Sequence, residues 1–216
     1  MAPALHGVYA ITDSQLMPNT LDLCAHVLLA LEGGVKIVQY RDKSDDQQKR
    51  IEEATALKEL CHEHGAALLI NDDINLAHFV GADGVHLGQS DGDVLQARGL
   101  LGENAIIGVT CHDSMDFARK AQAEGANYVA FGAFFKSKTK PNAKPAPLSL
   151  LAQAKAELLV PVVAIGGITV DNASQLTEQG CDMLAVVHSL FAEPGIRERA
   201  ERFAVAFNAT PDRITH

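Results

Sequence analysis

The chain has 216 residues, with 18 Lys or Arg against 27 Asp or Glu, so its formal net charge at pH 7 is −9. Hydrophobic residues make up 47%, a share typical of a globular protein and too high for a disordered one. The negative charge disfavours nucleic acids and anionic membranes as partners, because its long-range field repels polyanions. We expect a single domain over residues 1–216, in which any anionic ligand is bound by a local group of cations.

The four cysteines are far apart in the sequence and form no C-x-x-C pair, which favours a reducing compartment over a disulfide or zinc framework. The N-terminal segment MAPALHGVYAITD lacks the basic and apolar regions of a secretory signal. The longest uncharged stretch, residues 158–170, contains Pro161 and is shorter than the roughly 20 residues that a transmembrane helix needs. We therefore expect a cytoplasmic protein that does not enter a membrane.

Short apolar or β-branched runs alternate with segments of helical periodicity along the whole chain. The predicted strands are residues 7–11, 37–40, 67–71, 84–87, 106–110, 128–131, 162–165 and 183–187. The predicted helices are residues 20–32, 45–64, 74–80, 94–101, 114–124, 148–159, 172–179 and 195–208. Glycines such as Gly81, Gly125 and Gly180 stand where helices should end, as left-handed caps require.

This alternation predicts an α/β protein with parallel strands, because each return to a parallel strand needs a crossover helix. Eight units in 216 residues fit a single (β/α)8 TIM barrel, spanning about residues 7–208, better than an open sheet. No G-x-G-x-x-G follows the first strand, which disfavours dinucleotide binding. Functional residues are then expected at the C-terminal ends of the strands.

Cations gather after the second strand. Gln39, Arg41 and Lys43 alternate along the chain and should point to one side of the strand end. An amide and two cations facing a barrel interior suit a phosphate or pyrophosphate. The alternative interpretation is a strand end whose charges are simply solvated.

Carboxylates gather after the third and fourth strands. Asp72 and Asp91 would lie at neighbouring strand ends, where they can share one Mg²⁺ ion with phosphate oxygens and water. The alternative role for an acid here is to cap a helix, and Asp73 and Asp93 stand at predicted helix starts.

The longest connection, residues 132–145, holds four lysines and no acid, with hydroxyls at Ser137 and Thr139, and is predicted to capture an anion. The Gly166-Gly167 turn after the seventh strand lies where such barrels bind phosphate.

Three other patterns favour structural roles. His62 and His64 are two apart on a helix and cannot converge. Cys111 lacks a converging base, and His86 inside the fourth strand is expected to be a hydrogen-bonded interior residue.

Six motifs follow one another in the order VQYRDK, LLINDD, GADGVHLGQSD, IIGVTCH, YVAFGAFFKSKTKP and PVVAIGGIT. Together they resemble the thiamine phosphate synthase family from Gly7 to about Phe191. The resemblance implies a (β/α)8 barrel that joins a pyrimidine diphosphate to a thiazole phosphate. It also implies that Mg²⁺ and the cations of the site stabilise the departing pyrophosphate, so that the thiazole nitrogen captures a pyrimidine carbocation without a protein nucleophile.

The resemblance also assigns residues to these roles. The Mg²⁺ ligands would be Asp72 and Asp91. The catalytic cations would be Arg41, Lys43 and Lys140. The substrate contacts would be Gln39, Tyr40, Arg41, Asp42, Lys43, Asn71, Thr110, Ser137, Lys138, Thr139, Lys140, Gly167, Val187 and His188. His188 replaces a small serine, which leaves open whether its side chain or its backbone binds the thiazole phosphate.

Two alternatives stay open. A thiazole tautomerase or a non-catalytic regulator of the same family is expected to lose the diphosphate and Mg²⁺ residues, whereas Arg41, Lys43, Asp72, Asp91 and Lys140 are all present. An unrelated sugar-phosphate isomerase barrel would need an acid/base pair at the strand ends, and none is evident. Whether the chain forms a homo-oligomer is not decided by the sequence.

Overall fold

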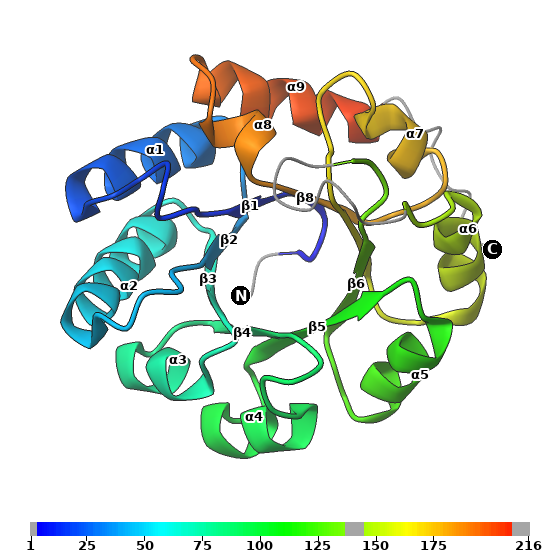
Figure 1. Ribbon diagram of the computed structural model, residues 1–216, viewed down its shortest axis with the longest axis horizontal. Helices are drawn as coiled ribbons and strands as arrows, with labels where there is room; N and C mark the ends of the chain where they lie inside the picture. The colour runs from blue at the N-terminus through cyan, green and yellow to red at the C-terminus, as the bar shows by residue number, and fades with distance from the viewer. Residues whose placement is uncertain (1–3, 137–144, 209–216) are drawn as a thin grey trace.

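The computed structural model describes residues 4–136 and 145–208, which form a closed ring of parallel strands surrounded by helices (Figure 1). The strands pair in chain order, and β8 closes on β1. They are β1 (Gly7–Ile11), β2 (Ile37–Tyr40), β3 (Ala67–Asn71), β4 (Gly84–Leu87), β5 (Ile106–His112), β6 (Tyr128–Gly132), β7 (Val162–Ile165) and β8 (Met183–Val186). The predicted TIM barrel is confirmed.

The helices cover the outside of the ring (Figure 1). They are α1 (Thr20–Glu32), α2 (Gln47–Glu63), α3 (Ile74–Val80), α4 (Val94–Leu101), α5 (Met115–Ala123), α6 (Ser149–Glu157), α7 (Ala173–Thr177), α8 (His188–Phe191) and α9 (Ile196–Asn208). Within residues 4–136 and 145–208, none of them has the length and apolarity needed to cross a bilayer. The short α8 was not predicted, and β8 ends at Val186 rather than Val187.

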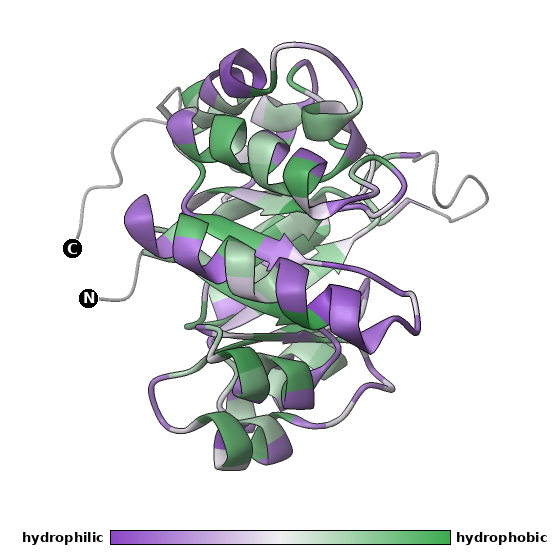
Figure 2. Ribbon diagram, turned by 90° about the vertical axis from the view of Figure 1, so that its left-hand side faces the viewer, coloured by the Kyte–Doolittle hydropathy of each residue, from purple (hydrophilic) through white to green (hydrophobic). Residues whose placement is uncertain are grey.

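Alternation along the strands divides the core into two layers. Ile37 belongs to the cluster inside the ring, whereas its neighbour Val38 packs outward beneath the helices. Leu5 packs against the inner cluster and so covers part of the N-terminal end of the ring. Hydrophobic residues accordingly predominate along the strands, whereas the helices carry both hydrophobic and hydrophilic residues (Figure 2).

Side-chain hydrogen bonds join three pairs of neighbouring strands at the N-terminal end of the barrel. Before β4, β6 and β8, a side-chain oxygen accepts the backbone N–H of the preceding strand, in the pairs Asp83 with Leu68, Asn127 with Ile107 and Asp182 with Val162 at 2.8, 2.8 and 2.9 Å. A side chain from a nearby helix bonds each of these residues in turn, namely His62, Arg98 and Lys155. These bonds lie at the end of the barrel opposite the predicted site.

Candidate active site

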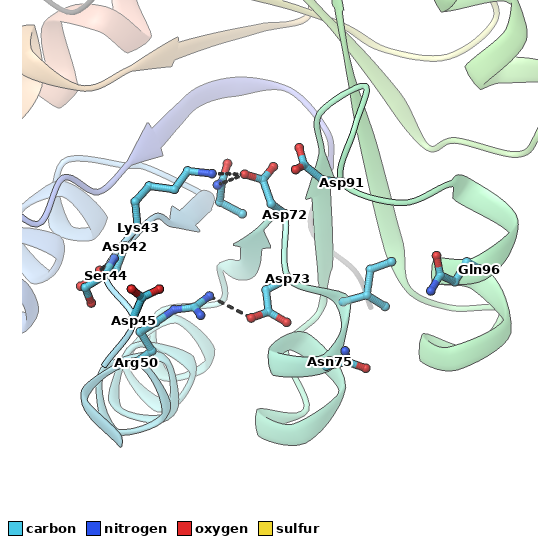
Figure 3. Close-up of a pocket in the computed structure, with 12 residues that line it drawn as sticks. Asp42, Lys43, Ser44, Asp45, Arg50, Asp72, Asp73, Asn75, Asp91 and Gln96 are labelled. Atoms are coloured by element: carbon cyan, nitrogen blue, oxygen red, sulfur yellow. Dashed lines mark hydrogen bonds and ion pairs between the residues drawn. The ribbon is translucent and has the colours of Figure 1, made fainter. Parts of the chain in front are cut away.

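A cleft of about 390 Å³ opens over the C-terminal ends of β2, β3 and β4 (Figure 3). It is lined by Asp42, Lys43, Ser44, Asp45, Arg50, Asn71, Asp72, Asp73, Ile74, Asn75, Asp91 and Gln96. The structure therefore brings together Lys43, Asn71, Asp72 and Asp91, which are predicted site residues at the ends of three different strands.

Asp72 directly follows β3 and is held in an unusual conformation. Its φ of 62° lies in the left-handed region, which is uncommon for residues other than glycine. Its backbone N–H donates to the His86 carbonyl oxygen at 2.8 Å, and Asn71 Nδ2 donates to its Oδ2 atom at 2.7 Å. Lys43 donates to the same Oδ2 atom across the cleft (Figure 3). Partial burial raises the pKa of the Asp72 carboxyl, but the Lys43 ammonium, together with hydrogen bonds from Asp91 and Asn71, outweighs this effect and lowers the pKa below its ordinary value.

Asp91 faces Asp72 from the loop after β4 (Figure 3). Desolvation, and then the neighbouring Asp72 carboxylate, raise the pKa of Asp91 above its ordinary value. Gly88 lies beside both acids, and a Cβ atom at this position would collide with the Asp91 carboxylate and lie 3.8 Å from Asp72 Oδ1. A glycine at this position thus leaves room for the two carboxylates to face each other.

The two acids suit one hard divalent cation, because Mg²⁺ takes one or two protein carboxylates and fills its octahedron with water and phosphate oxygens. Across residues 4–136 and 145–208, no set of three or more His, Cys, Asp or Glu side chains is placed to hold a metal ion.

The side chains of Tyr40 and Asp42, at the end of β2, contact α2 on the outside of the barrel. Arg41 is exposed, and its backbone N–H donates to Thr12 Oγ1 at 2.9 Å. Tyr40 points outward and donates to Glu53 Oε2 at 2.7 Å, and the buried Asp42 carboxylate pairs with Lys49. The side chains of Tyr40 and Asp42 thus bond α2. Asp42 nevertheless lines the cleft, whereas Tyr40 does not, so the predicted substrate contact at Tyr40 has no support from side-chain geometry.

Polar residues inside the barrel continue the site inward. Gln39 is buried and donates from Nε2 to the Tyr9 hydroxyl at 2.7 Å. His86 bonds the Tyr128 hydroxyl through Nδ1 and Thr110 Oγ1 through Nε2, both at 2.8 Å. Burial lowers the pKa of His86 to about 4, so the ring is neutral at pH 7. The interpretation of His86 as a hydrogen-bonded interior residue is confirmed.

The turns after β6, β7 and β8 pack together at the same end of the barrel. Gly167 has a φ of 65°, and a Cβ atom there would lie 2.5 Å from the carbonyl oxygen of Lys136. The hydroxyl of Ser189 donates to the Ile168 carbonyl oxygen at 2.5 Å and so joins the β7 and β8 turns. Val187 precedes the first residue of α8, His188, and both are half-buried.

Four of the predicted substrate contacts lie outside the described residues, namely Ser137, Lys138, Thr139 and Lys140.

The cysteine and the two histidines that could be mistaken for functional residues have structural roles. Burial raises the pKa of Cys111 to about 12, which disfavours a nucleophilic thiolate. His62 bonds Asp83, whereas His64 bonds the Leu60 carbonyl oxygen, so the two rings do not converge.

Several lining residues were not predicted from the sequence, and Arg50 is the most informative of them. Its Nη2 atom donates to Asp73 Oδ2 at 2.9 Å, which joins α2 to the loop after β3 (Figure 3). Asp73 also caps α3 by accepting from the Leu76 N–H at 2.8 Å, as its alternative reading predicted. In the sequence, Arg50 is one of many charged residues in a helical segment, and no motif marks it.

Comparison with known proteins identifies the family. A model of the thiamine monophosphate synthase family matches residues 8–190. The chain belongs to this family. It is 58% identical over 196 residues to the thiamine-phosphate synthase of Saccharophagus degradans, and the match covers 91% of this chain and 90% of that protein.

Solved structures agree with this assignment. Thiamine phosphate pyrophosphorylase from Pyrococcus furiosus superposes with a TM-score of 0.84 at 31% identity, covering 94% of this chain and 96% of that one. A 3-hexulose-6-phosphate synthase superposes with a TM-score of 0.67 at 18% identity, covering 93% and 99%. The second likeness shows the fold alone, because barrels of this kind carry many unrelated activities.

Proposed function

We propose that this member of the thiamine monophosphate synthase family makes thiamine phosphate. The substrates would be 4-amino-2-methyl-5-(diphosphooxymethyl)pyrimidine and 4-methyl-5-(2-phosphooxyethyl)thiazole, and pyrophosphate would leave. The main support for the proposal is that one cleft contains Lys43, Asp72 and Asp91. A diphosphate leaving group needs both a cation and a metal site. Family membership and the 58% identical relative support it.

Asp72 and Asp91 would hold the Mg²⁺ ion, which when bound neutralises charge on the diphosphate. The depressed pKa of Asp72 keeps one carboxylate ionised for this purpose. The proximity of the two acids favours the same ion, since a bound cation relieves their mutual repulsion.

The chain's own part in the reaction is electrostatic. The C–O bond between the pyrimidine methylene and the diphosphate breaks, and a C–N bond from the thiazole nitrogen forms. Arg41, Lys43 and Lys140 would stabilise the negative charge on the departing pyrophosphate. The walls of the site would hold the nitrogen about 3 Å from the carbon that it attacks, which supplies the remaining rate advantage by positioning. No protein nucleophile is needed, in keeping with the buried Cys111 and the neutral His86.

The remaining substrate contacts follow from the family resemblance. Gln39, Asn71 and Thr110 would contact the pyrimidine diphosphate from inside the barrel. Gly167, Val187 and His188 would contact the thiazole phosphate, together with Ser137, Lys138 and Thr139. The joined β7 and β8 turns support this placement, because these turns are the common phosphate site of (β/α)8 barrels. A cytoplasmic location fits the four cysteines, which form no disulfide.

The decisive experiment is incubation of the folded protein with both substrates, with and without Mg²⁺, followed by detection of thiamine phosphate and pyrophosphate. Formation of both products only when Mg²⁺ is present supports the proposal. Folded protein that binds the thiazole phosphate without forming either product would instead indicate a tautomerase or a regulatory relative.

A further inference from the structure

A continuous chain of hydrogen bonds crosses the interior of the barrel. Gln39 Nε2 bonds the Tyr9 hydroxyl at 2.7 Å, and the hydroxyls of Tyr9 and Tyr128 are 2.8 Å apart. His86 continues the chain, with Nδ1 bonded to the Tyr128 hydroxyl and Nε2 bonded to Thr110 Oγ1. The chain links β2 to β5 through residues of β1, β6 and β4, and both of its ends are expected substrate contacts.

The bond made by Gln39 sets the direction of every later bond. Its Nε2 atom donates to the Tyr9 oxygen, so the Tyr9 proton has to point elsewhere. Within the described residues, the other hydrogen-bond partner of that hydroxyl is Tyr128. Tyr9 therefore donates to Tyr128, which in turn donates its own proton to His86 Nδ1. A neutral ring that accepts at Nδ1 carries its proton on Nε2 and donates to Thr110.

The opposite tautomer is disfavoured by the same reasoning. A proton on Nδ1 would make Tyr128 donate to Tyr9, and the Tyr9 proton would then be buried without an acceptor in the part of the chain that the structure describes. A doubly protonated His86 ring would likewise leave the Tyr9 hydroxyl proton without an acceptor. An unsatisfied buried donor costs its full desolvation, whereas the one-way chain satisfies both tyrosine hydroxyls as acceptor and donor.

The residues packed around this chain of hydrogen bonds leave space for its aromatic rings. A Cβ atom at Gly108 would collide with the Tyr128 ring and its hydroxyl, so glycine at this position of β5 makes the space that Tyr128 fills. The His86 and Tyr128 rings stack at 20° with centroids 5.6 Å apart, and Tyr9 meets Tyr128 edge-on at 84°. The hydroxyls are thus held in place by close contacts as well as by hydrogen bonds.

We propose that Tyr9, Tyr128 and His86 are positioning residues that fix His86 in the Nε2–H tautomer and leave the Thr110 hydroxyl proton free to donate to a phosphate oxygen of the diphosphate. The inference rests on the proposed function, because it assumes that the diphosphate reaches Thr110. Thr110 occupies the C-terminal end of β5 on the inner face and is half-exposed there. A donor whose direction is set before the substrate arrives stabilises a departing anion without reorganisation.

The first test reads the tautomer directly. In ¹⁵N-labelled wild-type protein at pH 7, the imidazole nitrogen shifts of His86, identified by the signal that His86→Gln removes, should report Nε2 protonated and Nδ1 unprotonated. Tyr128→Phe should shift this pattern toward a mixture of tautomers. Tyr40→Phe is the matched control, because it removes a buried hydroxyl on the outer face of the barrel and should leave the His86 pattern unchanged. A wild-type ring protonated at Nδ1, or an unshifted pattern in Tyr128→Phe, overturns the proposal.

The second test measures whether the chain of hydrogen bonds affects turnover. Tyr128→Phe should lower kcat about tenfold, the loss expected when one hydrogen bond to a charged group is misaligned. In a Thr110→Val background, the same change should have no further effect, because the hydroxyl that it positions is gone. An equal tenfold loss in both backgrounds would mean that Tyr128 acts only by packing and would overturn the proposal. The NMR result needs no turnover, so failure of the tautomer assignment and failure of the synthase activity are distinguishable.

Discussion

Lys43 donates from Nζ to the Oδ2 atom of Asp72 and so joins the segments that follow β2 and β3. The pair is partly solvent-exposed, so it contributes little to stability by itself. Its effect lies in the site, because it holds one carboxylate ionised and directed into the cleft beside Asp91. The structure thus places a cation beside Asp72, in the cleft that also contains Asp91.

Removing either carboxylate should abolish the metal-dependent reaction. We expect Asp72→Asn and Asp91→Asn to lower kcat by two or more orders of magnitude while the fold is retained, because each removes a charged oxygen ligand. The measurement is turnover against Mg²⁺ concentration, with circular dichroism to confirm folding. Asp93→Asn is the control, since this residue caps α4 and asparagine caps equally well. Full activity of the wild type in EDTA would contradict the metal assignment.

Lys43 should act on the diphosphate substrate and not on the thiazole phosphate. Lys43→Gln is expected to raise the KM for the pyrimidine diphosphate and lower kcat, because a charge-assisted contact to the leaving group is lost. The KM for the thiazole phosphate should change little. Lys36→Gln removes a lysine at the other end of β2, where it bonds the His64 carbonyl oxygen, and should leave both constants unchanged. Equal effects on the two substrates would argue against this role.

Lys140 lies outside the described residues, and its role stays a prediction from the sequence. Lys140→Ala should reduce kcat more than it changes the KM for the thiazole phosphate, because the lysine is expected to contact the leaving diphosphate. Steady-state kinetics with each substrate varied in turn gives the comparison. An unaltered kcat would remove Lys140 from the chemistry.

Gly167 should be needed for binding of the thiazole phosphate. Gly167→Ala places a Cβ atom 2.5 Å from the Lys136 carbonyl oxygen at a φ of 65°, so it should separate the β6 and β7 turns. We expect a raised KM for this substrate together with a loss of about 1–3 kcal/mol in stability. Gly125→Ala controls for backbone strain, because Gly125 has a φ of 94° with open space around it. A raised KM in both variants would point to a general effect of strain.

Stability should fall in mild acid because of His86. Its pKa is about 4 in the folded protein against an ordinary value of 6.5, so the unfolded chain binds the extra proton first as the pH falls. Stability from this group is therefore constant above about pH 6.5 and declines between about pH 6.5 and pH 4. The loss between pH 7 and pH 5 should be about 2 kcal/mol. Urea unfolding at the two pH values should show a smaller loss in His86→Gln, and identical losses would contradict the assignment.

The sequence predicted the barrel well because every strand is a short apolar run set between polar helices. Most predicted bounds agree with the structure within a few residues. The helix expected at residues 45–64 begins at Gln47 instead, since Asp46 caps it by accepting from the Lys49 N–H. No pattern predicted α8, because one helical turn is too short to show periodicity. The prolonged β5 was also missed, as its register shift between Thr110 and His112 depends on pairing with β6.

The candidate site was predictable where motifs end strands, as with Asp72 and Lys43. Tyr40 shows the limit of that interpretation, since it stands inside the VQYRDK motif yet faces α2. The Tyr9–Tyr128 contact could not be predicted, because it joins residues 119 positions apart. Such partners follow from the closure and register of the ring, which no local pattern encodes.

Hydrogen bonds join β3 to β4, β5 to β6 and β7 to β8, and their position bears on how the sequence can evolve. Asp83, Asn127 and Asp182 secure one rim of the ring, and the reacting groups occupy the other. Substitutions that weaken these three bonds should therefore lower the melting temperature without contacting the reacting groups. A lineage can adjust this rim to a new habitat temperature without altering the strand ends that form the site.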